Sequence, residues 1–475
     1  MEGLAQELAA RMPLADAVLL LWGWVANEAF LDQLYERHRG RGFTRVLTFS
    51  VLVHLLADAL VLRRGSGRET FERARDQGEL PSSIQAAYGK LRRLPPALSE
   101  SFLAQATQRL RQLWPGGAAA ELPACLAQFA IVVLDGKTIK GLHKRLKPLR
   151  GVAGGAVGGK ALVGLELRTG LVLAMRTHLD GDADELALLP DLLAALRRGV
   201  SGKRLWMGDR AFSYVEYALQ LGSASDDFLV RRRANVTFQP DPRRKPRTGR
   251  DVSGRRFREE WGWLSRRGQP QALGVRQITL TLSGSQTLRL ITSLLDPQEY
   301  PAATLLALYR NRWQIERVFQ EITQVFGLKR LIGSSPRASI FQFAFCLLLY
   351  NTLQVVRAYV AQGQRRSPQT LSGEKLFRDL CRELSAWTLL IGPALTVSRG
   401  PGPAARTGSN GARPTTPAHL RGVIRQTLRP AWSHYWLKSP PQTRAARPPP
   451  KGPGQHVSAQ RIIDQYQRST KREKR

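Results

Sequence analysis

The stretch Ala130-Ile-Val-Val-Leu-Asp135 is an unbroken apolar run that ends in a carboxylate. Such a run is typical of a strand that is buried on both faces of a sheet. Two further strand patterns follow at residues 160–168 and 171–177, and Thr169-Gly170 between them predicts a hairpin. A sheet-forming region therefore begins near residue 129.

The residues after this hairpin alternate between helical and strand patterns. A helix is predicted at 185–196, a strand at 203–209, a helix at 214–221 and a strand at 227–231. The order of three strands, helix, strand, helix and strand predicts a mixed five-stranded α/β sheet flanked by helices.

The chain is strongly basic. It contains 72 Lys and Arg against 37 Asp and Glu, which gives a net charge of +35 at pH 7. Nucleic acid is the first candidate for a balancing polyanion, because each neutralised phosphate releases condensed counterions. A membrane surface is the alternative partner. We expect no membrane, because no apolar span of 18 residues is recognised.

Cysteine usage and the N-terminal pattern predict the compartment. The three cysteines are too few and too scattered for a disulfide framework or a zinc cluster. The apolar run at 17–26 is too short to cross a bilayer and lacks the features of a signal peptide. We therefore expect a soluble protein of the cytoplasm.

Two acids end predicted strands. Asp135 follows Ile-Val-Val-Leu, and Asp209 follows Leu-Trp-Met-Gly. A carboxylate at such a position projects from the edge of the sheet, where α/β proteins build their sites. An aspartate that only caps the next turn is the alternative for either one alone.

A third acid, Glu316, lies in a helical pattern that extends from residue 302 to 326. At about 100° per residue, Tyr309, Arg312 and Glu316 share one arc of this helix beside its buried stripe. The alternative is a solvated helix face with an ordinary Arg312–Glu316 ion pair.

Three carboxylates without His or Cys partners suit Mg²⁺ or Mn²⁺ rather than zinc. Two such ions that share carboxylate ligands can activate water and stabilise the leaving oxygen in phosphodiester cleavage. Together with the positive charge, this chemistry predicts a nucleic-acid backbone as the substrate.

These residues resemble the DDE insertion-sequence transposases, and specifically the subgroup with the signature Y-x2-R-x3-E-x6-K around the catalytic Glu. Tyr309, Arg312 and Glu316 match that signature at the required spacing. The family's first Asp matches in Val-Leu-Asp135-Gly-Lys, and its second in Gly-Asp209-Arg-Ala-Phe.

The resemblance covers roughly residues 125–360, and it includes Ile-Thr-Ser-Leu-Leu-Asp-Pro297 before the Glu helix and a β-rich insertion between Asp209 and Glu316. It implies an RNase H-like fold, with Asp135, Asp209 and Glu316 as catalytic residues and as ligands of two Mg²⁺ or Mn²⁺ ions. It also implies that Tyr309 and Arg312 contact DNA.

One position departs from the signature: Thr323 stands where the family has a Lys that is thought to contact the DNA end. The resemblance implies a bacterial cut-and-paste transposase that excises its own insertion sequence and joins it to target DNA. It would act on double-stranded DNA with terminal inverted repeats, as a homodimer, in association with the nucleoid. A hairpin intermediate is associated with the subgroup. The alternatives are a metal-dependent DNA nuclease on the same fold and a DNA-binding derivative that has lost the chemistry, which Thr323 favours.

A short helix is predicted between Pro81 and Pro95, and three basic residues, Lys90, Arg92 and Arg93, lie near its end. They are candidate DNA contacts. The alternative is that they only complement the helix dipole.

The acidic segment from His178 to Glu185 has enough carboxylates for a metal site. The alternative interpretation, a loop in which Asp182 or Asp184 caps the following helix, is the one that we favour.

The last 77 residues carry 16 Lys and Arg against two acids and are rich in Pro, Gly, Ser and Thr. This composition predicts a largely disordered segment that binds nucleic acid non-specifically or only improves solubility.

The chain then divides into a helical N-terminal DNA-binding domain (1–115), the first part of an RNase H-like catalytic core (125–233), a β-rich insertion (234–300), the Glu-bearing helices of the core (301–362), a C-terminal helical segment (363–398) and a basic Pro/Arg-rich tail (399–475).

Overall fold

The fold is described from a computed structural model of the chain. The described residues are 7, 10–40, 46–63, 66–117, 121–266, 269–282, 286–328, 330–390, 416–439 and 456–472.

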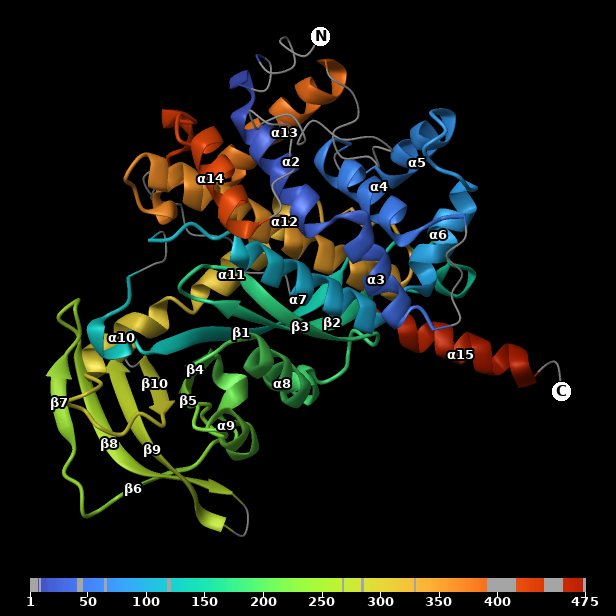
Figure 1. Cartoon of the computed structure of the whole chain (residues 1–475). Coiled ribbons are helices and arrows are strands. Elements are labelled where there is room, and N and C mark those ends of the chain that lie inside the picture. The colour runs from blue at the N-terminus through green and yellow to red at the C-terminus, as the bar shows by residue number, and fades with distance from the viewer. Residues whose placement is uncertain are drawn as a thin grey trace.

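A mixed sheet forms the centre of the molecule (Figure 1). Its first five strands lie in the order β3-β2-β1-β4-β5. Strand β2 is antiparallel to β1 and to β3, whereas β4 is parallel to β1 and β5 is parallel to β4. This is the expected RNase H-like arrangement. The bounds are Phe129–Lys140 for β1, Gly155–Glu166 for β2, Val172–His178 for β3, Lys203–Gly208 for β4 and Asp227–Arg231 for β5.

The predicted insertion is β-rich, but it continues the same sheet. Its last strand, β10, pairs antiparallel with β5, and β9 and β8 follow outward. Of the strands in this insertion, only β9 and β10 are predicted by the sequence pattern. The bounds are Phe238–Pro240 for β6, Arg247–Arg250 for β7, Arg256–Arg266 for β8, Gln269–Thr281 for β9 and Thr287–Thr292 for β10.

Helices cover both faces of the first five strands. In Figure 1, α8 (Leu189–Gly199) and α9 (Val215–Leu221) lie below the sheet, and α7 (Pro96–Gln112) and α12 (Pro336–Gly363) lie above it. The helix α12 is anchored to β3 by Asn351, whose side-chain amide bonds both the N–H and the carbonyl of Val172.

The N-terminal region is helical, as expected, and packs on α7 and α12. Rings of Phe49, Phe102, Phe341 and Phe345 meet edge-on, tilted or stacked between these helices, so the region shares one hydrophobic core with the sheet. The bounds are Pro13–Val25 for α2, Glu28–His38 for α3, Phe49–Val61 for α4, Gly67–Asp76 for α5 and Ile84–Arg93 for α6.

Two helical stretches are long and apolar enough to cross a membrane by length and composition, namely Pro13–His38 and α12. The sequence reasoning overlooked them. In α12, 94% of the most apolar window is buried inside the protein, and in the first stretch the share is 67%. Burial of this extent is what core helices show.

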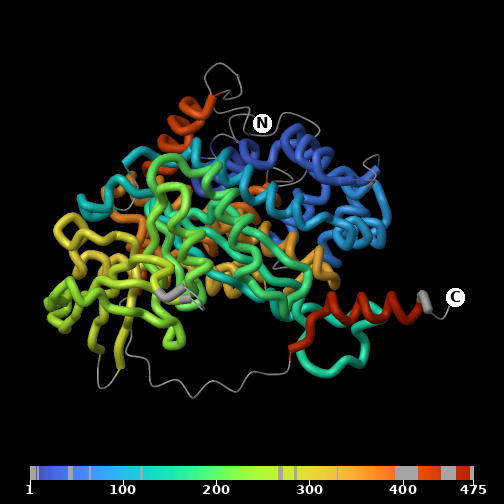
Figure 2. Tube along the Cα trace, turned by 90° about the horizontal axis from the view of Figure 1, so that it is seen from below, coloured from blue at the N-terminus to red at the C-terminus, as the bar shows by residue number. Residues whose placement is uncertain are grey.

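The expectation of a largely disordered tail is wrong for the part of it that the structure describes. The helix α14 (Pro417–Leu428) packs on α2 and α12, because Leu420, Ile424 and Leu428 form a buried stripe. The strand β11 (His456–Ser458) pairs with β2, and α15 (Ala459–Arg472) then extends beside the segment of η2 (Figure 2). The helix α13 (Gly373–Leu390) precedes them.

Short 3₁₀ helices are η1 (Ala124–Leu126), η2 (Lys147–Leu149), η3 (Glu185–Leu188), η4 (Arg210–Ser213), η5 (Pro368–Thr370) and η7 (His434–Trp436).

Candidate active site

The sheet places Asp135 and Asp209 side by side. Strands β1 and β4 run parallel, with Val133 opposite Met207, and each Asp lies two residues beyond this pair. The carboxylate of Asp135 accepts the Gly136 N–H at 3.0 Å. That of Asp209 accepts the Ala211 N–H at 2.7 Å and caps η4. Both side chains are therefore held by local backbone bonds at one edge of the sheet.

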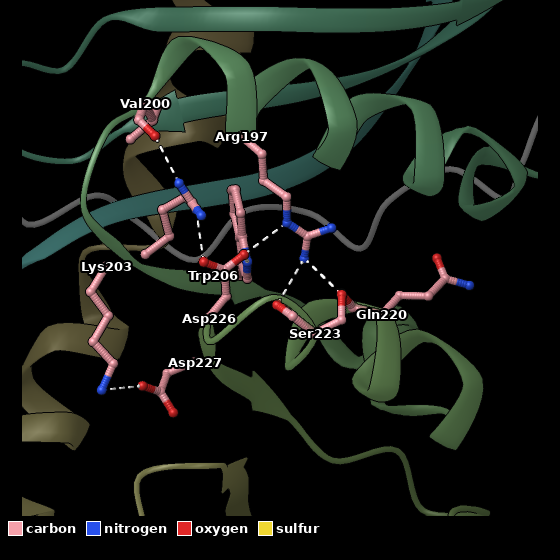
Figure 3. A network of polar contacts seen from close by, with 9 residues as sticks. Arg197, Val200, Lys203, Trp206, Gln220, Ser223, Asp226 and Asp227 are labelled. Carbon is pink, nitrogen blue, oxygen red and sulfur yellow. Dashed lines mark hydrogen bonds and ion pairs between the residues drawn. The ribbon is translucent and has the colours of Figure 1, made fainter.

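A buried cluster fixes the strand that leads to Asp209. Asp226 accepts hydrogen bonds from Arg197 of α8 at 2.8 Å, from Arg204 of β4 at 2.7 Å and from the Trp206 indole N–H at 3.1 Å. Figure 3 shows Asp226 with Arg197 and Trp206. Asp226 is buried, so these charge-assisted bonds replace its hydration. The cluster ties β4 to α8 and to the turn before β5.

The helix that was expected from residue 302 to 326 is two helices. The first, α10, spans Ala302–Arg310, and the second, α11, spans Trp313–Gln324. Between them the Arg312 N–H bonds the Tyr309 carbonyl at 3.0 Å, which is the tight i→i+3 geometry of a turn. The prediction that Tyr309 and Glu316 share one arc of a continuous helix is therefore wrong.

Within α11 the predicted faces are correct. Ile315, Phe319 and Ile322 are buried in the core, and Glu316 lies at the border of that stripe. Arg312 Nη2 bonds Glu316 Oε1 at 2.8 Å, while the Arg312 side chain is only 8% exposed. The ion pair that the sequence raised as an alternative is thus present, but its Arg312 side chain is buried and the pair lies at the site.

Tyr309 is buried and bonds to the strand that carries Asp209. Its hydroxyl donates to the Gly208 carbonyl at 3.1 Å, and burial raises its pKa to about 12. This side chain therefore connects α10 to β4. Its role as a DNA contact stays a prediction.

The carboxylates affect one another electrostatically. Burial raises the pKa of Asp135 to about 7, the charges of Asp209 and Glu316 add to this rise, and Arg312 opposes it. The three acids thus lie within electrostatic range, and their negative charge is only partly compensated.

A divalent metal fits this donor set by its chemistry, because hard carboxylate oxygens are the ligands that Mg²⁺ and Mn²⁺ prefer. Within the described ranges, no three His, Cys, Asp or Glu side chains are arranged as a ready metal cluster. Asp135, Asp209 and Glu316 are the residues that would hold the ion.

Sequence reasoning gave no role to Lys137. It lies two residues after Asp135, so it shares a face of β1 with that carboxylate. Its ammonium is 5.6 Å from the centre of the Phe319 ring on α11. Burial, together with Lys140, lowers the pKa of Lys137. Period-two spacing from Asp135 was the signal that would have identified this cation.

Thr323 uses its hydroxyl within α11, where it donates to the Phe319 carbonyl. The side chain lines a groove of about 1010 Å³ that also contains Leu60 of α4 and Phe377 of α13. The hydroxyl is thus engaged within its own helix.

The three basic residues of α6 have different surroundings. Lys90 is buried, donates to the Leu47 carbonyl and lies over the Tyr35 ring, and burial lowers its pKa to about 8. Arg92 and Arg93 are exposed. Only the two arginines therefore present their charge to solvent on this helix.

The acidic segment after β3 contains a helix N-cap, in agreement with the interpretation favoured from the sequence. Asp184 accepts the Leu186 N–H at 3.1 Å and caps η3. The carboxylate of the next residue, Glu185, lies against Gly136, the residue that follows Asp135.

Comparison with known proteins agrees with this geometry. Residues 127–352 match the family model described as "Transposase DDE domain". This segment is a DDE transposase domain. It includes all three carboxylates, Lys137 and Glu185.

Two known proteins are similar to this chain. The chain is 21% identical over 204 residues to "Putative transposase y4zB" of Sinorhizobium fredii, an alignment with 41% of this chain and 56% of that relative. The chain thus spans a little over half the length of that curated relative. A solved piggyBac transposase synaptic complex with hairpin DNA aligns with 90% of this chain and 88% of its own, at 13% identity and a TM-score of 0.41.

Proposed function

We propose that this chain is a DNA transposase that excises its own insertion sequence and joins it to target DNA in a metal-dependent reaction. The observation that carries the proposal is the alignment of Asp135 and Asp209 on adjacent parallel strands, with Glu316 brought beside them by α11. Its substrates would be double-stranded terminal inverted repeats and target DNA, which the charge of +35 would help to attract.

The residues of the site would have separate tasks. Asp135, Asp209 and Glu316 would hold two Mg²⁺ or Mn²⁺ ions, which supply activated water and stabilise the leaving oxygen when bound. Arg312 positions Glu316 through their 2.8 Å ion pair. Lys137, on the same face of β1 as Asp135, is placed to neutralise a phosphate. A homodimer that bridges the two element ends in the bacterial nucleoid is part of the same proposal.

A strand-transfer assay tests the function. The purified chain is incubated with Mg²⁺, target plasmid and labelled duplexes that carry the inverted repeats flanking its gene. Cleavage at the repeat end followed by joining to the plasmid supports a transposase. Cleavage without joining, and at any sequence, would indicate the nuclease alternative. Specific binding without cleavage would indicate a derivative that has lost the chemistry.

A further inference from the structure

Four acids lie between β3 and α8, and three of them have structural partners. Asp180 pairs with Arg461 of α15 at 2.6 Å, and Asp182 lies 3.7 Å from the same guanidinium. Asp184 caps η3. Among the residues that the structure describes, Glu185 accepts no hydrogen bond and forms no ion pair. It is the one acid of this segment whose carboxylate the fold does not use.

The Glu185 carboxylate lies in a space that exists because residue 136 is glycine. A Cβ built on Gly136 would be 2.8 Å from Glu185 Oε1 and closer still to Oε2. All three of the nearest atoms belong to this carboxyl group, so any other residue at 136 would displace it. Glu185 is therefore packed directly against the backbone of the residue that follows Asp135.

Glu185 approaches the site from the face opposite to that of Asp135. Successive side chains of a strand point to opposite faces, so position 136 faces away from α11 while Asp135 faces toward it. Asp209 is within electrostatic range of both. Burial raises the pKa of Asp135 and that of Glu185, and the charge of Asp209 adds to both rises. Lys160 opposes the rise for Glu185. Carboxylates thus surround the end of β4 from both faces of the sheet.

We propose that Glu185 is a fourth carboxylate of the DDE site, which helps to bind the divalent ion held by Asp135 and Asp209, directly or through a water molecule. The inference rests on the proposed function, because it adds a residue to that site.

Mn²⁺ binding to the full chain without DNA tests the proposal, with free Mn²⁺ followed by electron paramagnetic resonance. Glu185→Gln keeps the shape and removes the charge, and should weaken Mn²⁺ binding by about tenfold or more. Asp182→Asn removes one negative charge from the same loop and should change it less than twofold. Equal affinities for Glu185→Gln and the wild type would overturn the proposal.

Gly136→Ala gives a second test that does not depend on how Glu185→Gln folds. The added methyl should displace the carboxylate and weaken Mn²⁺ binding in the wild-type background, but have little further effect in Glu185→Ala, where the space is free. The same loss in both backgrounds would overturn the proposal. If the wild type bound no Mn²⁺, the proposed function would fail with it. Binding that needs Asp135 but not Glu185 would overturn this inference alone.

Discussion

The Tyr309 hydroxyl donates a hydrogen bond to the carbonyl oxygen of Gly208, the residue before Asp209, at 3.1 Å. Because both groups are buried, this bond fixes the end of α10 against the end of β4. One contact thus links the turn that begins the Glu316 helix to the strand that carries the second aspartate.

Tyr309→Phe should leave the Gly208 carbonyl without its partner. An unsatisfied buried acceptor costs about 1–3 kcal/mol, so we expect a loss of this size in the free energy of unfolding, together with slower cleavage. Tyr217→Phe is the control, because the described contacts include no hydrogen bond from that hydroxyl. Urea unfolding of both variants measures the effect, and equal stabilities would show that the bond contributes nothing.

Arg312→Ala should reduce cleavage by roughly 10–100-fold, because a carboxylate that is no longer positioned loses the geometry that the reaction needs. Arg317→Ala, on an exposed position of the same helix, should have little effect. Arg312→Lys should rescue poorly, since an ammonium does not reproduce the planar guanidinium. Rate constants on one labelled end duplex compare the three variants, and equal rates for the two alanine variants would contradict the assignment.

Without divalent metal, Asp135 should make the fold less stable as the pH rises. Its pKa is about 7 in the folded protein against 3.8 in the unfolded chain, so between these values the folded state binds more protons. Stability is then lost from about pH 4 to pH 7. In EDTA at pH 8, Asp135→Asn should therefore be more stable than the wild type, by a few kcal/mol at most.

Thermal unfolding of both proteins at pH 5 and pH 8 provides the measurement. The stabilisation by Asp135→Asn should shrink at pH 5, and Mn²⁺ should raise the melting temperature of the wild type more than that of the variant. A destabilised Asp135→Asn at pH 8 would mean that the carboxylate is not strained by its neighbours.

Thr323→Lys should strengthen binding to element ends and steepen its salt dependence. Position 323 is seven residues after Glu316, so it returns to nearly the same side of α11. One added phosphate contact should change the log–log salt slope by about 0.9. The Thr323 hydroxyl is engaged with Phe319 and releases no counterion. Titrations of end DNA with Thr323→Lys and with the wild type at several salt concentrations measure this slope. An unchanged slope in Thr323→Lys would mean that a cation such as Lys137 already neutralises that phosphate.

The sequence predicted what depends on local pattern. The buried strand before Asp135, the Thr169-Gly170 hairpin and the stripe of α11 follow from periodicity and turn chemistry, and all three are present. It did not predict the break between α10 and α11, because no Gly or Pro marks it and the i→i+3 bond at Arg312 is a property of the packed turn.

The contacts that refine the site are long-range ones. Glu185 meets Gly136 only after the sheet has formed. Lys90 is turned inward by Tyr35 of α3 and by Leu47 in the bend before α4. In the tail, α14 is ordered by burial against α2 and α12, which composition alone does not reveal.

The central claim is that Asp135, Asp209 and Glu316 act together on the DNA backbone. The most direct measurement is strand transfer of a labelled element end in Mg²⁺ by Asp135→Asn, Asp209→Asn and Glu316→Gln, with end binding measured in parallel. Each amide keeps the shape of the side chain and removes the charge that would hold the metal. We predict that all three variants lose cleavage and joining while they still bind the end. Near-normal strand transfer by any one of them would contradict the account.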